Sequence, residues 1–370
     1  MPIADDAFEL EAPATSGGPA RGDCPLGWTE SVFRATFLDF LAEVGEPRYR
    51  ERQLAKWVWT RAPESFADMS DLPSQLRREL DERFSLHALD RVEELVSRDG
   101  TRKFLWRRRR GKGDIESVWI PDGDRLTYCI SSQSGCPVRC PFCATGHGGF
   151  EGQLEPAEII DQVVRMRSIT GAAPTNIVFM GMGEPLLNFD AVLRSLEILT
   201  HPEQIGMGAR RITVSTVGIP SRIRELSRRF PQVKIALSLH AARDDLRNEL
   251  VPLNTRFPLD DVLAAVREVA TATGKLATVE YVLLPGVNDS DGDADELAQL
   301  LRSVPCRVNL IGFNPFPGAA YAKPKVPSLV RFQKRLSERF PGPVMLRRPR
   351  GDDIQGACGQ LSASARSTGV

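Results

Sequence analysis

The chain has 370 residues, of which 42% are hydrophobic and 26% are charged, and its 48 basic side chains balance its 48 acidic ones. This composition is typical of a globular protein with room for two domains or for one large α/β barrel with an appendage. No stretch approaches the ~20 apolar residues of a membrane span, and the N-terminus lacks the basic start and apolar run of a secretory signal. We therefore expect a cytoplasmic protein without membrane contact, and the zero net charge argues against a general nucleic-acid binder.

The charges are unevenly distributed along the chain. Residues 1–24 hold five acids and one base, so the remainder holds 47 bases and 43 acids. This segment is also rich in Ala, Gly and Pro, which predicts a disordered acidic tail, and we expect a short second tail at 363–370. Residues 98–112 carry eight bases and one acid, including four consecutive arginines at 107–110. They form a local basic patch on a neutral protein.

A small helical domain is predicted over residues 25–88. Apolar side chains recur there at helical spacing in three groups: Phe33, Phe37, Phe40 and Leu41; Leu54, Trp57 and Val58; Leu76, Leu80 and Phe84. We expect Ser70 or Asp71 to cap the last helix, with Pro73 in its first turn.

Residues 89–124 predict a basic β-hairpin with Asp99-Gly100 as its turn, followed by a further strand at 115–121. Strand alternation places Glu116 on the same face as Val118 and Ile120. A carboxylate on an apolar face can serve as a general base. The alternative is a half-exposed hairpin glutamate without a catalytic role.

Residues 125–362 alternate short apolar strands with longer helical stretches. The predicted strands are 127–131, 176–181, 211–216, 234–239, 278–284, 307–313 and 343–348, and the predicted helices include 157–169, 191–199, 221–230, 260–273 and 294–303. Such alternation indicates βαβ units around a parallel sheet. The predicted fold class is α/β, a partial (βα)6-type barrel with its chemistry at the carboxyl ends of the strands.

Three closely spaced cysteines, Cys136, Cys140 and Cys143, follow the first barrel strand. Three thiolates on one short loop can hold a [4Fe–4S] cluster, and the fourth iron is then open to the amine and carboxylate of a ligand such as S-adenosylmethionine. The alternative is a structural zinc site with Cys129 as fourth ligand, although this spacing fits poorly with the paired knuckles of zinc ribbons.

Polar residues follow several other strands and are candidates for binding that cofactor. They are Gly183 and Glu184 after the second strand, Ser215, the run Ser238, Leu239 and His240, and Asn314. Glycine lets a ligand approach the backbone closely, and the carboxylate can pair with an amino group. Taken singly, each could equally be a satisfied polar group of an ordinary loop.

Four cysteines lie outside the cluster motif. Cys358 sits in a glycine-rich loop after the last strand and is a candidate nucleophile, while Cys129 lies in the first barrel strand. The alternative for both is an inert, small apolar side chain. Cys24 and Cys306 carry no motif, and we expect neither to have a function.

The motifs TYCISSQSGCPVRCPFCATG, MGMGEPLLN, ITVSTVGIP, ALSLHA, IGFNPFPGA and RGDDIQGACGQL together resemble the RlmN family of radical-SAM RNA methyltransferases, whose near relative is the Cfr family. The resemblance runs from about residue 30 to 365, includes the helical domain and leaves out the acidic tail. It implies a radical-SAM barrel with a [4Fe–4S] cluster and S-adenosylmethionine as cofactors.

The resemblance also implies the reaction. The family methylates C2 of an adenosine in 23S rRNA at the peptidyl-transferase centre, and of the adenosine 3′ of the anticodon in tRNA. One S-adenosylmethionine methylates Cys358, and a second yields the radical that activates this methyl group. Glu116 then removes the C2 proton, and Cys129 releases the product by forming a disulfide with Cys358.

The implied partners are 23S rRNA, tRNA and an electron donor such as flavodoxin, for a monomeric enzyme. The helical domain and the basic hairpin, with Lys103, Trp106 and the arginines, could grip RNA, although a charge-protected edge strand is the alternative. Three other functions remain open: C8 methylation as in Cfr, a radical-SAM reaction on a small molecule or peptide, and a zinc-binding RNA adaptor.

Overall fold

The computed structural model describes residues 22–363. Most of the predicted acidic tail and of the predicted C-terminal tail therefore lies outside the described residues. Residues 22–24 pack on the helical domain, where the amide of Gly22 donates to the carbonyl of Arg83. No described helix is long and apolar enough to cross a membrane.

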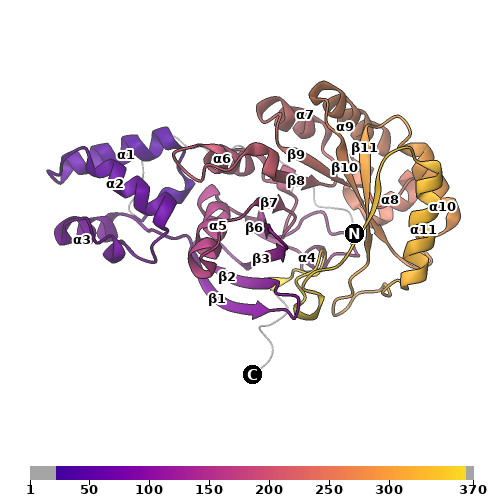
Figure 1. The fold of residues 1–370 in the computed structure, drawn as a ribbon, viewed down its shortest axis with the longest axis horizontal. Helices are drawn as coiled ribbons and strands as arrows, with labels where there is room; N and C mark the ends of the chain where they lie inside the picture. The colour runs from indigo at the N-terminus through magenta and orange to yellow at the C-terminus, as the bar shows by residue number, and fades with distance from the viewer. Residues whose placement is uncertain (1–21, 364–370) are drawn as a thin grey trace.

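The helical domain lies at one end of the molecule (Figure 1). It contains η2 (Pro25–Gly27), α1 (Glu30–Glu43), α2 (Arg50–Ala55), η3 (Lys56–Arg61), η4 (Phe66–Asp68) and α3 (Ser74–Arg83). Aromatic rings form its core, as the predicted spacing requires: Phe37 packs edge-on against Phe33 and Phe84. The predicted cap of the last helix is wrong. Pro73 occupies the N-cap of α3, and Asp71 instead accepts a hydrogen bond from the indole of Trp57.

The described residues form one ten-stranded sheet and one two-stranded sheet. The large sheet has the order β1-β2-β3-β4-β7-β8-β9-β10-β11-β12, with β5 paired to β6 separately. The strands are β1 (Leu89–Val96), β2 (Arg102–Arg108), β3 (Asp114–Asp122), β4 (Arg125–Cys129), β5 (Gln133–Gly135), β6 (Phe150–Gln153), β7 (Asn176–Phe179), β8 (Ile212–Thr216), β9 (Lys234–Ser238), β10 (Ala277–Leu283), β11 (Cys306–Gly312) and β12 (Val344–Arg347).

Within the large sheet, the strands from β4 to β12 pair in parallel, with helices outside them (Figure 1). The helices are α4 (Ala144–His147), α5 (Pro156–Thr170), α6 (Phe189–Thr200), α7 (Pro220–Arg229), α8 (Asp244–Leu250), α9 (Leu259–Thr273), α10 (Asp291–Leu300) and α11 (Val326–Arg339), with short turns η5 (Pro185–Leu187), η6 (Ala209–Arg211), η7 (Pro252–Thr255) and η8 (Asp352–Ile354). The predicted partial α/β barrel is confirmed. Each predicted strand lies within one or two residues of an observed one, and β12 adds a parallel strand to the six of the basic pattern.

The predicted hairpin is present, but it is not a separate linker. β1 and β2 pair antiparallel around the Asp99-Gly100 turn, β3 pairs with β2, and β3 also pairs with β4. The segment 89–122 therefore extends the barrel sheet as an antiparallel meander. This continuity fixes Glu116 on β3 relative to the first barrel strand.

A buried ion pair joins the helical domain to the barrel. His87 Nδ1 lies 2.8 Å from Asp161 Oδ1 on α5, and its other ring nitrogen contacts the carbonyl of Pro63. The second Asp161 oxygen accepts from the amides of Ala88 and Leu89. Both side chains are almost fully buried, so this contact holds the start of β1 against the barrel.

Candidate active site

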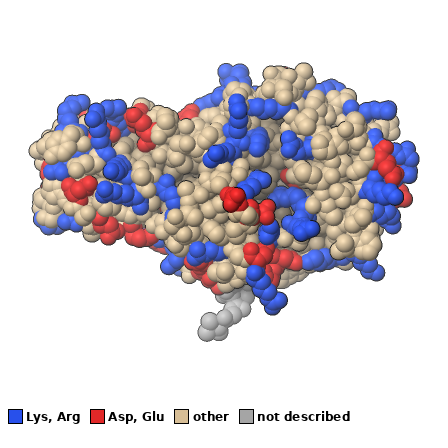
Figure 2. Space-filling model, in the orientation of Figure 1, with Lys and Arg blue, Asp and Glu red and all other residues tan. Residues whose placement is uncertain are grey.

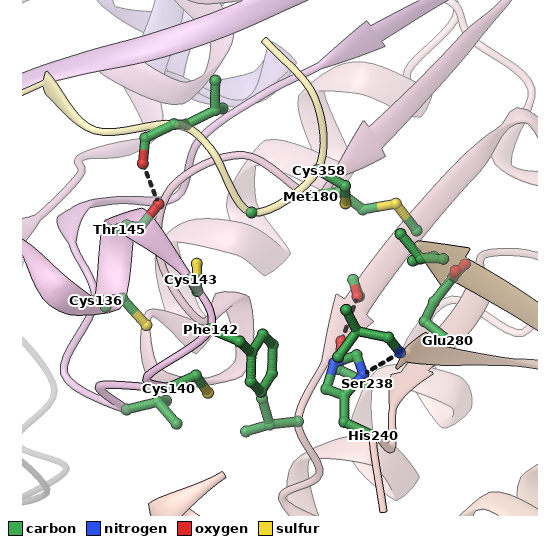
Figure 3. Close-up of a pocket in the computed structure, with 18 of the residues that line it drawn as sticks. Cys136, Cys140, Phe142, Cys143, Thr145, Met180, Ser238, His240, Glu280 and Cys358 are labelled. Atoms are coloured by element: carbon green, nitrogen blue, oxygen red, sulfur yellow. Dashed lines mark hydrogen bonds between the residues drawn. The ribbon is translucent and has the colours of Figure 1, made fainter. Parts of the chain in front are cut away.

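One cavity opens at the carboxyl ends of the parallel strands, where the barrel rule places function. The predicted residues that line it are Cys136, Cys140, Cys143, Gly183, Glu184, Ser215, Ser238, His240, Asn314 and Cys358. The three cysteines of the loop lie together on one side, and Cys358 lies across from them on the C-terminal segment (Figure 3). Three predicted residues, Cys129, Leu239 and Glu116, lie beside the cavity rather than in its wall.

The cysteine loop is held by backbone contacts on both sides. The amide of Cys136 donates to the carbonyl of Gly149, and the amide of Ala144 donates to the carbonyl of Gly359 in the C-terminal segment. Burial raises the pKa of Cys136 and of Cys140, and each is raised further by neighbouring cysteines. Thiols that raise one another's pKa in this way need a cationic partner to ionise, which is what iron in a cluster supplies.

The zinc alternative requires Cys129 as fourth ligand, and Cys129 does not join the loop. Its strongest charged neighbours are Cys358 and Arg347. The donor set of three thiols around one cavity matches cluster ligation.

Gly183 and Glu184 lie in the turn after β7. Gly183 has a φ of +98°, and a Cβ there would come 2.5 Å from the Cβ of Gln133, so only glycine fits. Burial raises the pKa of Glu184 to about 7. The hydrogen bonds that its carboxylate accepts from the amides of Val217 and Leu186 lower the pKa and offset part of this effect. A buried carboxylate in a cavity wall is a fitting partner for the ammonium group of S-adenosylmethionine.

The remaining predicted cofactor residues lie at or just beyond the carboxyl ends of β8, β9 and β11. The hydroxyls of Ser215 and Ser238 lie 3.2 Å apart, and the side-chain amide of Asn314 donates to the carbonyl of Cys358 at 3.2 Å. Burial lowers the pKa of His240 to about 3, so its ring is neutral, and its Nδ1 accepts from the amide of Val282. Leu239 is fully buried, and its amide donates to the carbonyl of Glu280, so only its backbone is near the site.

Cys358 and Cys129 form a second group of thiols. Cys358 lines the cavity and is exposed in it, whereas Cys129 is buried at the end of β4, and the charge of Cys358 acts on Cys129. Burial raises the pKa of Cys129 to about 12, with Cys358 adding to the shift and Arg347 opposing it. Although the Cys358 side chain is open to the cavity, the protein atoms packed around it shield it from bulk water and raise its pKa, and Arg347 again opposes the shift. The guanidinium of Arg347 therefore favours the thiolate form of both cysteines.

Glu116 is fully enclosed, which contradicts the half-exposed alternative. Its side chain is 3% exposed, its Oε1 lies 3.0 Å from Nζ of Lys103, and its Oε2 accepts from the amide of Ser362 at 2.8 Å. The residues just after Cys358 thus cover the predicted base. The predicted RNA grip of Lys103 and Trp106 is wrong, because their exposed fractions are 3% and 0%.

The four consecutive arginines are each paired with an acid. Arg107 pairs with Asp114, Arg108 with Glu158, Arg109 with Asp90, and Arg110 with Asp23. The Arg108 pair is buried, with side chains 6% and 3% exposed, so this arginine fixes the meander to α5 and does not face RNA. Arg107, Arg109 and Arg110 remain exposed.

Sequence reasoning missed Glu280 and Arg347, which also line the cavity. Nη1 of Arg347 lies 3.8 Å from Oε2 of Glu280, and the amide of Asn309 donates to the other Glu280 oxygen. A signal for Glu280 was present, because a charged residue inside the apolar strand TVEYVLL needs a partner. Arg347 gave no such signal, since it stands at the end of a strand beside other basic residues.

A three-cysteine loop after the first strand of a partial parallel barrel, with a buried glutamate after the second, defines a radical-SAM enzyme. Residues 130–298 match the Radical SAM superfamily, whose members use a [4Fe–4S] cluster and S-adenosylmethionine, and residues 31–86 match the ribosomal RNA large subunit methyltransferase N-terminal domain. These cofactors agree with the donor set described above.

Relatives extend this similarity over most of the chain. The dual-specificity RNA methyltransferase RlmN of Marinomonas sp. (strain MWYL1) is 43% identical over 334 residues, covering 88% of this chain and 90% of the relative. A probable RlmN of Gemmatimonas aurantiaca is 46% identical over 324 residues, covering 87% and 88%. The crystal structure of a radical SAM methyltransferase from Sphaerobacter thermophilus is 45% identical, with a TM-score of 0.87, and covers 92% of this chain and 100% of that one. The chain belongs to the RlmN family of radical-SAM RNA methyltransferases.

Proposed function

We propose that this enzyme methylates C2 of adenosine in 23S rRNA at the peptidyl-transferase centre and in tRNA at the position 3′ of the anticodon. The methyl group travels through Cys358 as S-methylcysteine, and release involves a transient disulfide with Cys129. Two molecules of S-adenosylmethionine are used in each turnover. The similarity to relatives named dual-specificity RNA methyltransferases supports both classes of RNA substrate.

The proposal rests mainly on the proximity of the three loop cysteines to the pair formed by Cys358 and Cys129. Cys358 lines the same cavity as Cys136, Cys140 and Cys143, and Cys129 is close enough for its charge to interact with that of Cys358. A radical-SAM reaction on a small molecule needs only the first group. The second group supplies a carrier thiol and a resolving thiol beside it.

Each residue has a role that follows from its position. Cys136, Cys140 and Cys143 would hold the cluster, and Glu184 would bind the ammonium group of S-adenosylmethionine. Bound there, the two cofactors supply a one-electron reaction that can remove a hydrogen atom from a methyl group. Such a reaction is needed because the aromatic C2 carbon of adenine is too unreactive for ordinary methyl transfer. Cys358 carries the methyl group to the adenine, Glu116 takes the C2 proton, and Cys129 attacks the sulfur of Cys358 to free the product.

The RNA would approach the face shown in Figure 2, where Lys and Arg side chains are spread over the helical domain and the barrel and several border the central hollow. Phosphate contacts there would be independent of sequence, and the target adenine would leave its stack to reach the cavity. The proposal includes a monomeric, cytoplasmic enzyme supplied with electrons by a donor such as flavodoxin.

The direct test is to identify the methylated base. RNA from a strain that lacks its own adenine methyltransferases but expresses this chain is digested, and the methyladenosine isomers are separated by mass spectrometry. We expect 2-methyladenosine in both rRNA and tRNA, and none in a strain that expresses Cys358→Ala. 8-Methyladenosine would show a reaction of the Cfr type, and unmodified RNA beside active cofactor cleavage would overturn the proposal.

A further inference from the structure

Lys103 is a buried cation with no place in the mechanism described so far. It lies on β2 opposite Val118 of β3, and the next pair on the same face is Leu105 with Glu116. Lys103 and Glu116 are thus diagonal neighbours across the two strands, within reach of long side chains. Their charged atoms lie 3.0 Å apart, and the side chains are 4% and 3% exposed. An ion this well shielded from water is costly to leave without a partner, so the contact holds the two side chains together.

The same pair holds the C-terminal segment on both sides of Cys358. Nζ of Lys103 donates to the carbonyl of Gln355 at 3.1 Å, three residues before Cys358. Oε2 of Glu116 accepts from the amide of Ser362 at 2.8 Å, four residues after it. The ion pair and the segment that carries Cys358 therefore form one hydrogen-bonded network.

The two oxygens of Glu116 are in different situations. Oε1 faces the lysine on the neighbouring strand of the same rigid sheet, whereas Oε2 faces a backbone amide of the C-terminal segment. If that segment moves when RNA enters, Oε2 loses its partner while Oε1 keeps Lys103. A carboxylate held at one oxygen and open at the other is oriented to accept a proton.

We propose that Lys103 is a positioning residue that holds and aims the Glu116 carboxylate, so that Glu116 Oε2 accepts the proton from adenine C2 once residues 360–362 withdraw. This inference rests on the proposed function, because it takes Glu116 as the base. In the step itself the C2–H bond breaks, its electron pair stays on the ring, and a new O–H bond forms on Glu116. Lys103 keeps its own protons and does not touch the adenine.

Isotope substitution at adenine C2 distinguishes a positioning role of Lys103 from a merely structural one. RNA carrying deuterium at adenine C2 is compared with ordinary RNA for the unsubstituted chain, Lys103→Met and Lys103→Arg. We expect Lys103→Met to slow RNA methylation by about tenfold or more and to enlarge the isotope effect, since proton removal becomes limiting. Methylation of Cys358 by S-adenosylmethionine stays intact, and Lys103→Arg, which keeps the charge, restores most of the rate.

Arg102 provides the matched control. It is the neighbouring residue on β2, pairs with Glu94 and lies outside the network, so Arg102→Met leaves the isotope effect unchanged. An unaltered rate and isotope effect in Lys103→Met would overturn the inference, as would a parallel loss of Cys358 methylation. If the unsubstituted chain itself methylates a position other than C2, the proposed function fails instead.

A second measurement needs neither cofactor nor RNA. Hydrogen–deuterium exchange of the cluster-free protein reports the amides of residues 351–362 directly. Lys103→Met should speed exchange there by about tenfold while leaving α5 protected, and adding Glu116→Gln should have little further effect because both act through one network. Equal exchange in all variants would contradict the network.

Discussion

Burial separates the cysteines of this chain into groups with different chemistry. Cys136, Cys140 and Cys143 share a loop, in which burial and the neighbouring cysteines raise the pKa of Cys136 and of Cys140, while Cys129 and Cys358 form a pair beside Arg347. The buried Cys129 has a pKa of about 12, so as a thiol it is a weak nucleophile until a charge or a partner changes its surroundings. This arrangement suits a thiol that must act late in the reaction.

Replacing Cys129 tests its role as the resolving thiol. In Cys129→Ala we expect multiple turnover to fall by at least ~10²-fold, with a covalent adduct of protein and RNA accumulating, because the attack on Cys358 is lost. The adduct is measured by denaturing gel electrophoresis after anaerobic reaction. Cys306→Ala is the matched control, since Cys306 is also a buried strand cysteine with a raised pKa, but burial is the only cause of its shift and Cys358 does not contribute. Free turnover by Cys129→Ala would remove this residue from the mechanism.

At the scale of elements, the antiparallel meander is a platform for the C-terminal segment. Ser97 Oγ donates to Asp353, the amide of Gly351 donates to Asp99, and Lys103 donates to the carbonyl of Gln355. The β1–β2 turn and the segment that carries Cys358 are therefore fastened together over long sequence separations. Two arginines of the run fix this meander to other parts of the molecule, since Arg108 pairs with Glu158 of α5 and Arg110 pairs with Asp23.

Within the arginine run, we expect Arg108 to contribute to stability and the exposed Arg107 to contribute little. Arg108→Ala leaves Glu158 buried without its bidentate partner, and we expect a loss of about 3–5 kcal/mol in the free energy of unfolding. Arg107→Ala breaks only an exposed pair, so its loss should stay below about 1 kcal/mol. Urea unfolding followed by circular dichroism measures both. An equal loss of unfolding free energy in the two variants would show that the buried ion pair contributes no more to stability than the exposed one.

Across the whole molecule, the helical domain and the barrel meet at the ion pair of His87 and Asp161. Burial lowers the pKa of His87, but the carboxylate of Asp161 more than offsets this, so the pKa is raised overall. Both ring nitrogens have acceptors as partners, which suits the protonated ring. The contact between the domains thus depends on a histidine staying charged.

The pH dependence of stability follows from that raised pKa. A group whose pKa is higher in the folded state contributes its full stabilisation below the unfolded pKa of about 6.5, and this stabilisation is lost as the pH rises through the folded value. We expect the free energy of unfolding to fall as the pH rises above about 6.5 in the unsubstituted protein. His87→Gln should be less stable at pH 6 and flatter over this range, as measured by chemical denaturation at each pH. The same slope in both proteins would contradict the assignment.

Much of the fold was predictable because its signals are local. Strand ends at Ser215, Ser238 and Asn314 were found from apolar alternation, and the parallel barrel brings such ends to one edge. The cap of α3 was misjudged because Asp71 is engaged by Trp57, a residue of another helix. Leu239 was predicted with its neighbours, yet its side chain points into the core.

The sequence by itself determined the cysteine loop, the barrel and the glycine turn before Glu184, because each depends on the spacing of a few neighbouring residues. Only the tertiary structure decided what Lys103, Trp106 and the arginine run do. Their partners, among them Gln355, Glu158 and Asp23, are up to 252 residues away along the chain. Whether a basic side chain meets solvent or a buried carboxylate is set by such long-range packing, which a local pattern of charges does not encode.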